Sequence, residues 1–318
     1  MKIVILDGHA VNPGDMSWSA FQKLGELEVF DRTSESDVVS RARDADVVLT
    51  TRTPLSAATI AQLRRVRYIG VVFTGYDQVD LKAARENNIV VTNVPTYGSA
   101  SVAQLVFALL LELCHHVGLH SEATRASEWS RSQDFSFWKT PLLELEGKTM
   151  GIVGLGRIGR HVAEIAVPMG MHVIANDAAK IDTPNWPGFR WCELDELMAA
   201  ADVVSLHCPL LPQTHGIINA ASLSKMKPSG FLINTSRGPL VVERELADAL
   251  NEGRLAGAGV DVLSSEPPSR DNPLLHAKNC IVTPHIAWAT REARMRLVDT
   301  AVTNFKAFLE GHPVNVVN

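Results

Sequence analysis

The stretch 149–160 combines an apolar run, a cluster of glycines and the start of a helical pattern, and it constrains the fold more than any other feature. The apolar run ends at Val153 and predicts a short buried strand. Three glycines follow in G-x-G-x-x-G spacing: Gly154, Gly156 and Gly159. The first glycine of such a motif permits a tight turn, the second lets the backbone approach a pyrophosphate, and the third lets helix and strand pack closely. We expect the helix to cover 160–167 and to direct free N–H groups at phosphate oxygens.

An acidic residue stands where a dinucleotide-binding unit needs one. A second predicted strand, 171–176, leads into Asp177, which lies 21 residues after Gly156. An acid at about that distance accepts hydrogen bonds from an adenosine ribose. Its charge would repel a 2′-phosphate, and Ala178 and Ala179 offer no arginine to hold one, so the sequence favours NAD over NADP. The alternative is a plain βαβ turn followed by a surface aspartate.

Charge and cysteine content exclude several classes of function. The chain has 318 residues, a net charge of −5 and no basic block, so we expect neither nucleic acid nor a membrane as a partner. Its four cysteines are scattered without a C-x-x-C pair, so no metal site and no disulfide framework are expected. The N-terminus enters a predicted strand without the apolar segment of a signal peptide. A cytoplasmic protein is predicted.

Strands and helices alternate along most of the chain, which predicts an α/β protein with parallel sheets covered by helices on both faces. Apolar strands are predicted at 2–6, 46–50, 68–73 and 89–93, and after the glycine turn at 171–176, 202–207, 230–235, 258–262 and 280–283. With the strand before the turn, the second series has six strands. The amphipathic helix 292–309 comes last and is expected to return to the first domain. The prediction is two doubly wound domains, with a Rossmann NAD-binding domain (99–286) inserted in a flavodoxin-like substrate domain (1–98 and 287–318).

The region between the two strand series contains a long apolar helix and a loop rich in aromatic residues. A long helix is predicted from Ser101 to about His120, with apolar residues on more than one face, as in helices buried between domains or subunits. A loop-like stretch follows that holds Phe135, Phe137 and Trp138. These rings could fill the core, form a subunit contact or line the active site.

Three polar side chains follow strand ends in the second half of the chain: Arg237, Glu266 and His285. Ligands of parallel sheets bind at the carboxyl ends of the strands, so all three are expected at one cleft. Together they suit the reduction of a 2-keto acid. His285 can donate the proton, Glu266 can fix its tautomer and favour its charged form, and Arg237 can bind the carboxylate. A surface or phosphate-binding arginine, a solvated turn glutamate and a loop histidine are the alternatives.

A resemblance joins these pieces. The glycine motif is followed by His207-Cys-Pro-Leu-Leu-Pro-Gln-Thr214, Asn234-Thr-Ser-Arg-Gly238, Glu266-Pro-Pro and Pro284-His285-Ile-Ala-Trp288. In this order and spacing they resemble the D-isomer-specific 2-hydroxyacid dehydrogenases over nearly the whole chain.

The resemblance implies a role for each matching residue. Arg237, Glu266 and His285 are then the catalytic set, and the backbone amides of Thr74 and Gly75 bind the substrate carboxylate. The implied cofactor contacts beside the three glycines are Arg157, Ile158, Asp177, His207, Cys208, Pro209, Thr214, Thr235 and Asp261. The family also implies a homodimer paired through the glycine-motif domain, a role that would suit the helix from Ser101.

Two softer stretches, 94–104 and 133–138, look most like glycerate dehydrogenases, also called hydroxypyruvate reductases. They imply hydroxypyruvate or glyoxylate as substrate, and we hypothesise that Trp138 walls the substrate pocket, either in its own subunit or in the neighbouring one. Some transcriptional corepressors resemble the same family and bind NADH as sensors, so a binding protein without turnover is the competing interpretation. Other Rossmann dehydrogenase classes fit the Glu-Pro-Pro and Pro-His spacing less well.

Overall fold

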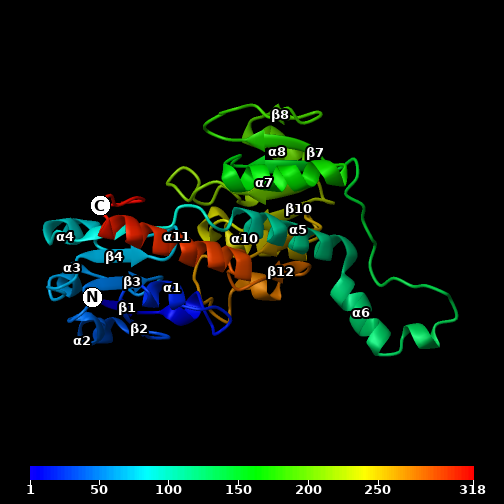
Figure 1. The fold of residues 1–318 in the computed structure, drawn as a ribbon. Helices are drawn as coiled ribbons and strands as arrows, with labels where there is room; N and C mark the ends of the chain where they lie inside the picture. The colour runs from blue at the N-terminus through cyan, green and yellow to red at the C-terminus, as the bar shows by residue number, and fades with distance from the viewer. The chain divides into compact units, whose positions relative to one another are not determined.

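The computed structural model of the protein describes all 318 residues and divides them into two compact units. Residues 1–98 together with 289–318 form unit 1, and residues 99–288 form unit 2. The chain therefore leaves unit 1 once and returns to it once, and Figure 1 shows the last helix, α11, beside the strands of unit 1. The return lies two residues beyond the boundary predicted at residue 286.

Unit 1 is built on a five-stranded parallel sheet in the order β2-β1-β3-β4-β5, the order of flavodoxin-like folds. Its strands are β1 (Lys2–Ile5), β2 (Glu26–Val29), β3 (Val47–Thr50), β4 (Tyr68–Val71) and β5 (Val90–Thr92). Its helices are α1 (Ser19–Gln22), α2 (Val38–Ala42), α3 (Ala57–Ile60), α4 (Leu81–Glu86) and α11 (Arg291–Leu309), with 3-10 turns at η1 (Gly8–Ala10) and η2 (Glu35–Asp37). Strands β3 and β4 are fully buried, as continuous apolar runs in a parallel sheet require. Sequence patterning misses β2, because this edge strand is only half-buried and mixes Glu with Leu and Val.

The C-terminal tail protects the other edge of this sheet. The amide of Val317 donates to the carbonyl oxygen of Val91 at 2.9 Å. The side chain of Asn318 accepts a hydrogen bond from the amide of Val91 and donates one to the carbonyl oxygen of Ile89. The tail thus satisfies edge groups that would otherwise be open to pairing with another chain.

Unit 2 contains a seven-stranded parallel sheet in the order β12-β11-β10-β9-β6-β7-β8. Its strands are β6 (Thr149–Val153), β7 (His172–Asn176), β8 (Arg190–Trp191), β9 (Val203–Leu206), β10 (Phe231–Asn234), β11 (Gly257–Val260) and β12 (Cys280–Val282). The two doubly wound parallel sheets confirm the predicted fold class. The predicted count of six strands is wrong by one, because β8 has two residues and pairs only with β7 at the sheet edge.

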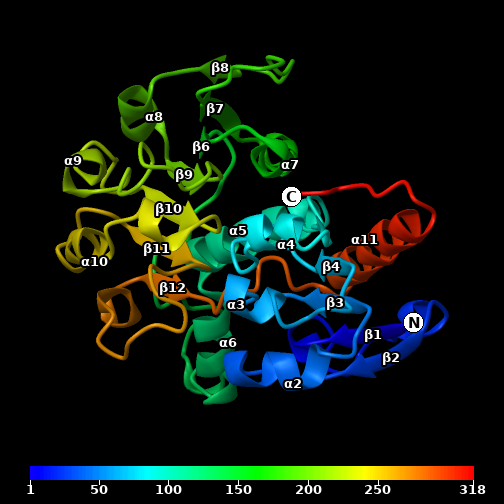
Figure 2. The same cartoon turned by 90° about the vertical axis from the view of Figure 1, so that its left-hand side faces the viewer.

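Unit 2 contains six α-helices, and all but α6 lie over the two faces of this sheet. They are α5 (Ser99–His115), α6 (Val117–Arg125), α7 (Arg157–Ala166), α8 (Leu194–Ala200), α9 (Ala220–Leu223) and α10 (Glu243–Asn251), with 3-10 turns at η3 (Trp129–Arg131), η4 (Val167–Met169), η5 (Gly238–Leu240) and η6 (Pro273–His276). Figure 2 shows α8, α9 and α10 on one face and α5 and α7 on the other. The first strand of the unit, β6, lies between β7 and β9, so strand order reverses between β6 and β9. Ligands of doubly wound sheets bind at that point, beyond the carboxyl ends of the strands.

Two predicted helices differ from the observed ones. The helix expected to run from Ser101 to His120 breaks at His116, whose left-handed backbone (φ +46°) ends α5 and begins α6. Most of α5 packs into the core of unit 2, so its apolar faces are buried within the unit. The helix after the glycine turn begins at Arg157, three residues earlier than expected, because Gly156 already takes the N-cap position.

No single helix is long and apolar enough to cross a membrane. Helices α5 and α6 meet that length and composition only as a pair, and the pair is bent by 56°.

Candidate active site

The glycine turn connects β6 to α7 at the point where strand order reverses. Gly154 has φ +95°, and a Cβ there would lie 2.5 Å from the backbone nitrogen of Cys208 at the end of β9. A Cβ on Gly159 would lie 2.3 Å from the carbonyl oxygen of Gly154, so only glycine lets the helix approach the turn this closely. At Gly156, by contrast, a Cβ would meet nothing within 4 Å, and the open side of the turn leaves room for a ligand. Arg157 and Ile158 form the first turn of α7.

Asp177 directly follows β7 and lies against the glycine turn. One carboxylate oxygen accepts the amide N–H of Leu155 at 2.7 Å, and the other accepts that of Ala179 at 2.9 Å. These bonds fix the carboxylate beside the turn, and each oxygen retains a lone pair for a further donor. The position matches that of an acid that binds an adenosine ribose.

The segment after β9 forms the opposite wall of the turn. The backbone of His207 donates to Val153, and its Nε2 lies 2.8 Å from the hydroxyl of Ser205. Burial lowers the pKa of His207 far below its usual range, so the ring is neutral at pH 7. The hydroxyl of Thr214 donates to the carbonyl oxygen of Pro209 at 2.7 Å. This residue, predicted to contact the cofactor, therefore also stabilises the 209–214 loop.

Arg237 follows β10 on a turn that other side chains shape. The buried amide of Asn234 donates to the carbonyl oxygen of Arg237 at 2.9 Å and accepts the N–H of Ser236. A Cβ on Gly238 would lie 2.0 Å from the carbonyl carbon of Leu263, so only glycine allows this turn to touch the segment that leads to Glu266. The side chain of Arg237 is exposed, and its Nη1 atom donates to the carbonyl oxygen of Ser236 at 2.8 Å. The remaining N–H groups of the guanidinium are left to bind an anion. Sequence reasoning did not assign Asn234 a role, although its position at the strand end was visible.

Glu266 and His285 form a hydrogen-bonded pair. The Nδ1 atom of His285 lies 2.6 Å from Oε2 of Glu266, and Oε1 of Glu266 accepts the amide of Leu263 at 3.1 Å. Both side chains are half-buried. With Nδ1 engaged by the carboxylate, Nε2 is the ring atom left to meet a substrate. The structure therefore brings together two residues that lie 19 positions apart in the sequence.

Asp261 holds the segment that carries His285. Its buried carboxylate accepts hydrogen bonds from the hydroxyl of Thr283 at 2.6 Å and from the amides of Ile286 at 2.9 Å and Ala287 at 2.8 Å. The amide of His285 itself donates to the carbonyl oxygen of Asp261 at 2.8 Å, and His285 has the left-handed φ of +54°. Asp261, which the resemblance implies to be a cofactor contact, thus holds the 283–287 turn in place. No sequence signal we used pointed to this contact.

In unit 1, the segment after β4 offers two backbone donors. The hydroxyl of Thr74 donates to the carbonyl oxygen of Val94 at 2.9 Å, and the side chain of Asn93 donates to the carbonyl oxygen of Thr74 at 2.7 Å. The turn is fixed from the neighbouring strand end, while the amides of Thr74 and Gly75 have no partner within the protein.

Trp138 lies in the loop that follows α6. Figure 1 shows α6 and this loop extending away from the rest of unit 2. Phe135 is 92% exposed and Trp138 67% exposed, so the first of the three interpretations of these rings, core filling, does not hold for either of them. The loop is nevertheless ordered by its own bonds, since the indole of Trp129 donates to the carbonyl oxygen of Phe135 and the Lys139 amide donates to His120 Nε2.

Comparison with known proteins decides the family. Residues 107–287 match the model of the D-isomer specific 2-hydroxyacid dehydrogenase NAD binding domain. The chain is 52% identical to the hydroxypyruvate reductase of Blautia hydrogenotrophica, with both chains covered completely, and 38% identical to the glycerate dehydrogenase of Methylorubrum extorquens over 85% of this chain and 84% of that one. This protein is a D-isomer-specific 2-hydroxyacid dehydrogenase. The solved structure of a D-lactate dehydrogenase with NAD+ from Lactobacillus jensenii superimposes with a TM-score of 0.85 at 26% identity, covering both chains fully.

The predictions of an oxidoreductase of this family, of 2-keto acid reduction and of NAD as cofactor are thereby confirmed. The dehydrogenase has the features that NAD requires. The Gly156 turn is open, the helix N-terminus of α7 follows it, and Asp177 stands beside it. At the end of β10, the hydroxyl of Thr235 is buried without any hydrogen-bond partner, as expected of a group that a bound ligand satisfies. The residues that would hold the cofactor are the glycine turn, Asp177 and Thr235.

Proposed function

We propose that this dehydrogenase reduces hydroxypyruvate to D-glycerate, and glyoxylate to glycolate, with His285 as the general acid. The observation that carries the proposal is the 2.6 Å pair of His285 and Glu266, positioned by Asp261 at the carboxyl ends of β11 and β12. The full-length similarity to a hydroxypyruvate reductase supports the choice of substrate. Residues 99–288 are the NAD-binding domain in this proposal, and unit 1 is the substrate domain.

The proton chemistry follows from the pair. When bound, the reduced nicotinamide supplies a hydride to the keto carbon. Negative charge then develops on the keto oxygen, and His285 Nε2 donates a proton to it. The carboxylate of Glu266 stabilises the imidazolium that must be present before this transfer and holds the ring so that Nε2 carries the reactive proton. In the oxidative direction His285 must begin neutral, so reduction should persist to lower pH than oxidation.

Two kinds of donor hold the substrate carboxylate in this proposal. Arg237 binds it with a planar, always charged guanidinium and polarises the adjacent carbonyl. The unpartnered amides of Thr74 and Gly75 donate to its oxygens. Fixed donors of this kind bind a 2-keto acid and disfavour uncharged ketones, because a carboxylate is needed to satisfy them.

The enzyme acts as a cytoplasmic homodimer in this proposal, with no nucleic acid and no membrane as partner. The exposed apolar side chains beside α6 support a subunit contact: Val117, Trp129, Phe135, Trp138 and Leu142. Several large exposed apolar side chains within one segment are typical of an interaction surface. Trp138 then reaches the substrate pocket of the neighbouring subunit and restricts its width.

The test is NADH oxidation with hydroxypyruvate, glyoxylate, pyruvate and a branched 2-keto acid, repeated with NADPH. The proposal expects hydroxypyruvate or glyoxylate to give the highest kcat/KM and NADH to be preferred over NADPH. A preference for pyruvate or the branched acid would overturn the substrate assignment. The Trp138→Ala variant should change the ranking of the acids, and an unchanged ranking would remove Trp138 from the pocket wall.

A further inference from the structure

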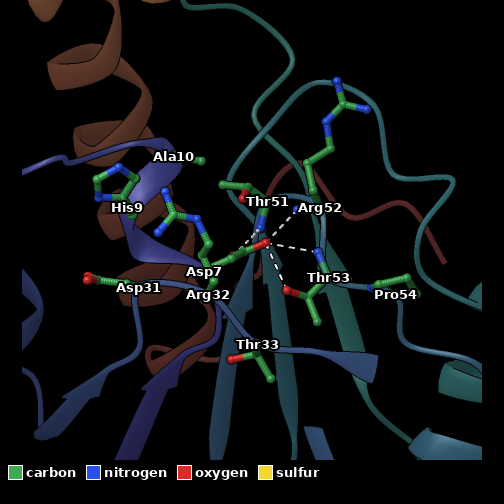
Figure 3. A pocket seen from close by; sticks show the side chains of 10 residues that line it. All are labelled: Asp7, His9, Ala10, Asp31, Arg32, Thr33, Thr51, Arg52, Thr53 and Pro54. Atoms are coloured by element: carbon green, nitrogen blue, oxygen red, sulfur yellow. Dashed lines mark hydrogen bonds between the residues drawn. The ribbon is translucent and has the colours of Figure 1, made fainter. Parts of the chain in front are cut away.

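Unit 1 contains a cavity of about 440 Å³ beyond the carboxyl ends of β1, β2 and β3. Its lining comes from the segments 7–10, 31–33 and 51–54, and Figure 3 shows these side chains. Strand order in the sheet reverses between β1 and β3, which makes this the position where flavodoxin-like sheets bind ligands. The volume is that of a small-molecule site. Neither Thr74 nor Gly75 lines it, so it is separate from the proposed carboxylate-binding turn.

The cavity holds a buried hydroxyl without a partner. Thr51 is 4% exposed, and its Oγ1 atom makes no hydrogen bond in the protein. The backbone of Thr51 is fixed on both sides, because its amide donates to Asp7 at 2.8 Å and its carbonyl oxygen accepts from Gln78 at 2.6 Å. An unsatisfied polar atom in a rigid loop is costly, and a ligand oxygen in the cavity would satisfy it.

Two further side chains of the cavity lining, Arg32 and His9, can also donate hydrogen bonds to a ligand. The guanidinium of Arg32 has no ion pair or hydrogen bond, and in Figure 3 it rises between His9 and Thr51. Arginine carries five N–H donors and no acceptor, and its planar fork matches phosphate and carboxylate oxygens. The imidazole of His9 adds a further ring nitrogen on the opposite wall.

The acidic residues of the lining do not oppose an anion. Asp7 accepts hydrogen bonds from the amides of Thr51, Arg52 and Thr53, so its carboxylate is a structural support of the loop. Figure 3 shows the carboxylate of Asp31 pointing away from the Arg32 guanidinium. The side chain of Arg52 also points away, toward the Phe73 ring at 5.6 Å.

We propose that this cavity is a second binding site, for a small oxyanion such as the phosphate or carboxylate group of a metabolite. Arg32 binds two of its oxygens, and Thr51 donates its unpartnered hydroxyl to it. The proposal does not depend on the proposed substrate, because it concerns groups in unit 1 outside the reaction described above.

Isothermal titration of the full chain with inorganic phosphate, in saturating NADH, tests the site. Wild type should show saturable binding, and Arg32→Gln should weaken it by about tenfold or more, the loss expected for a charge-assisted hydrogen-bonded contact. Thr51→Val should weaken it several-fold, whereas Thr51→Ser keeps the hydroxyl and should bind as wild type. The matched control is Arg64→Gln, which removes an exposed charge of the same unit and should have no effect. Absence of saturable binding, or equal affinities in the Arg32 and Arg64 variants, would overturn the proposal.

A second experiment locates the anion and separates its sources. Phosphate should slow the phenylglyoxal modification of Arg32 but not that of Arg64, as followed by peptide mass spectrometry. Malonate serves as the carboxylate probe, and the better protector of Arg32 identifies the preferred oxyanion. Equal modification rates with and without both anions would show that the cavity binds neither of them, and would contradict the proposal.

Discussion

The amide of His285 donates a hydrogen bond of 2.8 Å to the carbonyl oxygen of Asp261, and the carboxylate of the same aspartate holds the two residues that follow the histidine. The ring that we propose as the proton donor is therefore oriented from its own backbone as well as by Glu266. Its left-handed φ of +54° is a conformation that non-glycine residues adopt only where the surroundings enforce it. Asp261 provides that enforcement.

The Asp261→Asn variant tests this positioning role. An asparagine keeps one acceptor oxygen and turns its NH₂ group toward the backbone amide of either Ile286 or Ala287, so one of the two hydrogen bonds is lost and the His285 ring would shift. We expect kcat to fall by roughly 10- to 100-fold, since small displacements of catalytic groups have effects of this size. Thr283→Val removes only the third bond and should have a smaller effect. A lower melting temperature with unchanged kcat would show that Asp261 supports the fold alone.

Glu266→Gln removes a charge while retaining a hydrogen-bonding side chain of the same shape. The imidazolium form of His285 then loses its electrostatic stabilisation, so the proton donor is depleted as pH rises. Reduction should therefore decline at lower pH in the variant than in wild type. Rates of keto-acid reduction measured from pH 5 to 9 provide the test. Superimposable pH profiles would remove the electrostatic part of the role given to Glu266.

Asp202 links pH to stability at the opposite end of the sheet. Burial raises the pKa of its carboxyl, but the Lys227 ammonium at 2.8 Å and the Thr149 amide at 2.8 Å outweigh burial, and the pKa lies below its usual value. A folded-state pKa below the unfolded value, near 4, gives stability that is present above about pH 4 and lost as pH falls through the folded pKa. Asp202→Asn should therefore destabilise the protein by about 1–2 kcal/mol at pH 7. In urea unfolding the difference should shrink below about pH 4, and a constant difference across pH would contradict this assignment.

The thiols should be inert in the native protein. Burial raises the pKa of Cys114 and Cys208 to about 11 and that of Cys280 to about 12. Since the thiolate is the reactive form, iodoacetamide at pH 8 should leave these residues unmodified until the protein is unfolded. Rapid labelling of Cys208 in the native enzyme would mean that the segment after β9 opens to solvent.

The sequence was sufficient for the strands that hold continuous apolar runs and for the glycine turn, because their signals are local. It was insufficient for β8, which has two residues and exists only by pairing with β7. It also failed at His116, where one left-handed residue divides an apolar pattern that continues past it.

In the site, too, some residues could be predicted from local sequence signals and others could not. Arg237, Glu266 and His285 could be picked from strand ends, since parallel topology alone gathers them at one edge. The clamp formed by Asp261 and the turn shaped by Asn234 depend on hydrogen-bond partners that no periodicity reveals. The unpartnered hydroxyl of Thr51 likewise becomes visible only when all its neighbours are placed.

The central claim is most directly tested by measuring NADH oxidation with hydroxypyruvate in the wild-type enzyme and the His285→Gln variant, with NADH affinity measured alongside. Removing a general acid costs about 10²- to 10⁴-fold. We predict turnover by wild type, a loss of that size in the variant, and similar NADH affinity in both. Tight NADH binding by wild type without turnover of hydroxypyruvate or any other 2-keto acid would contradict the account and favour an NADH sensor that retains the catalytic residues as a scaffold.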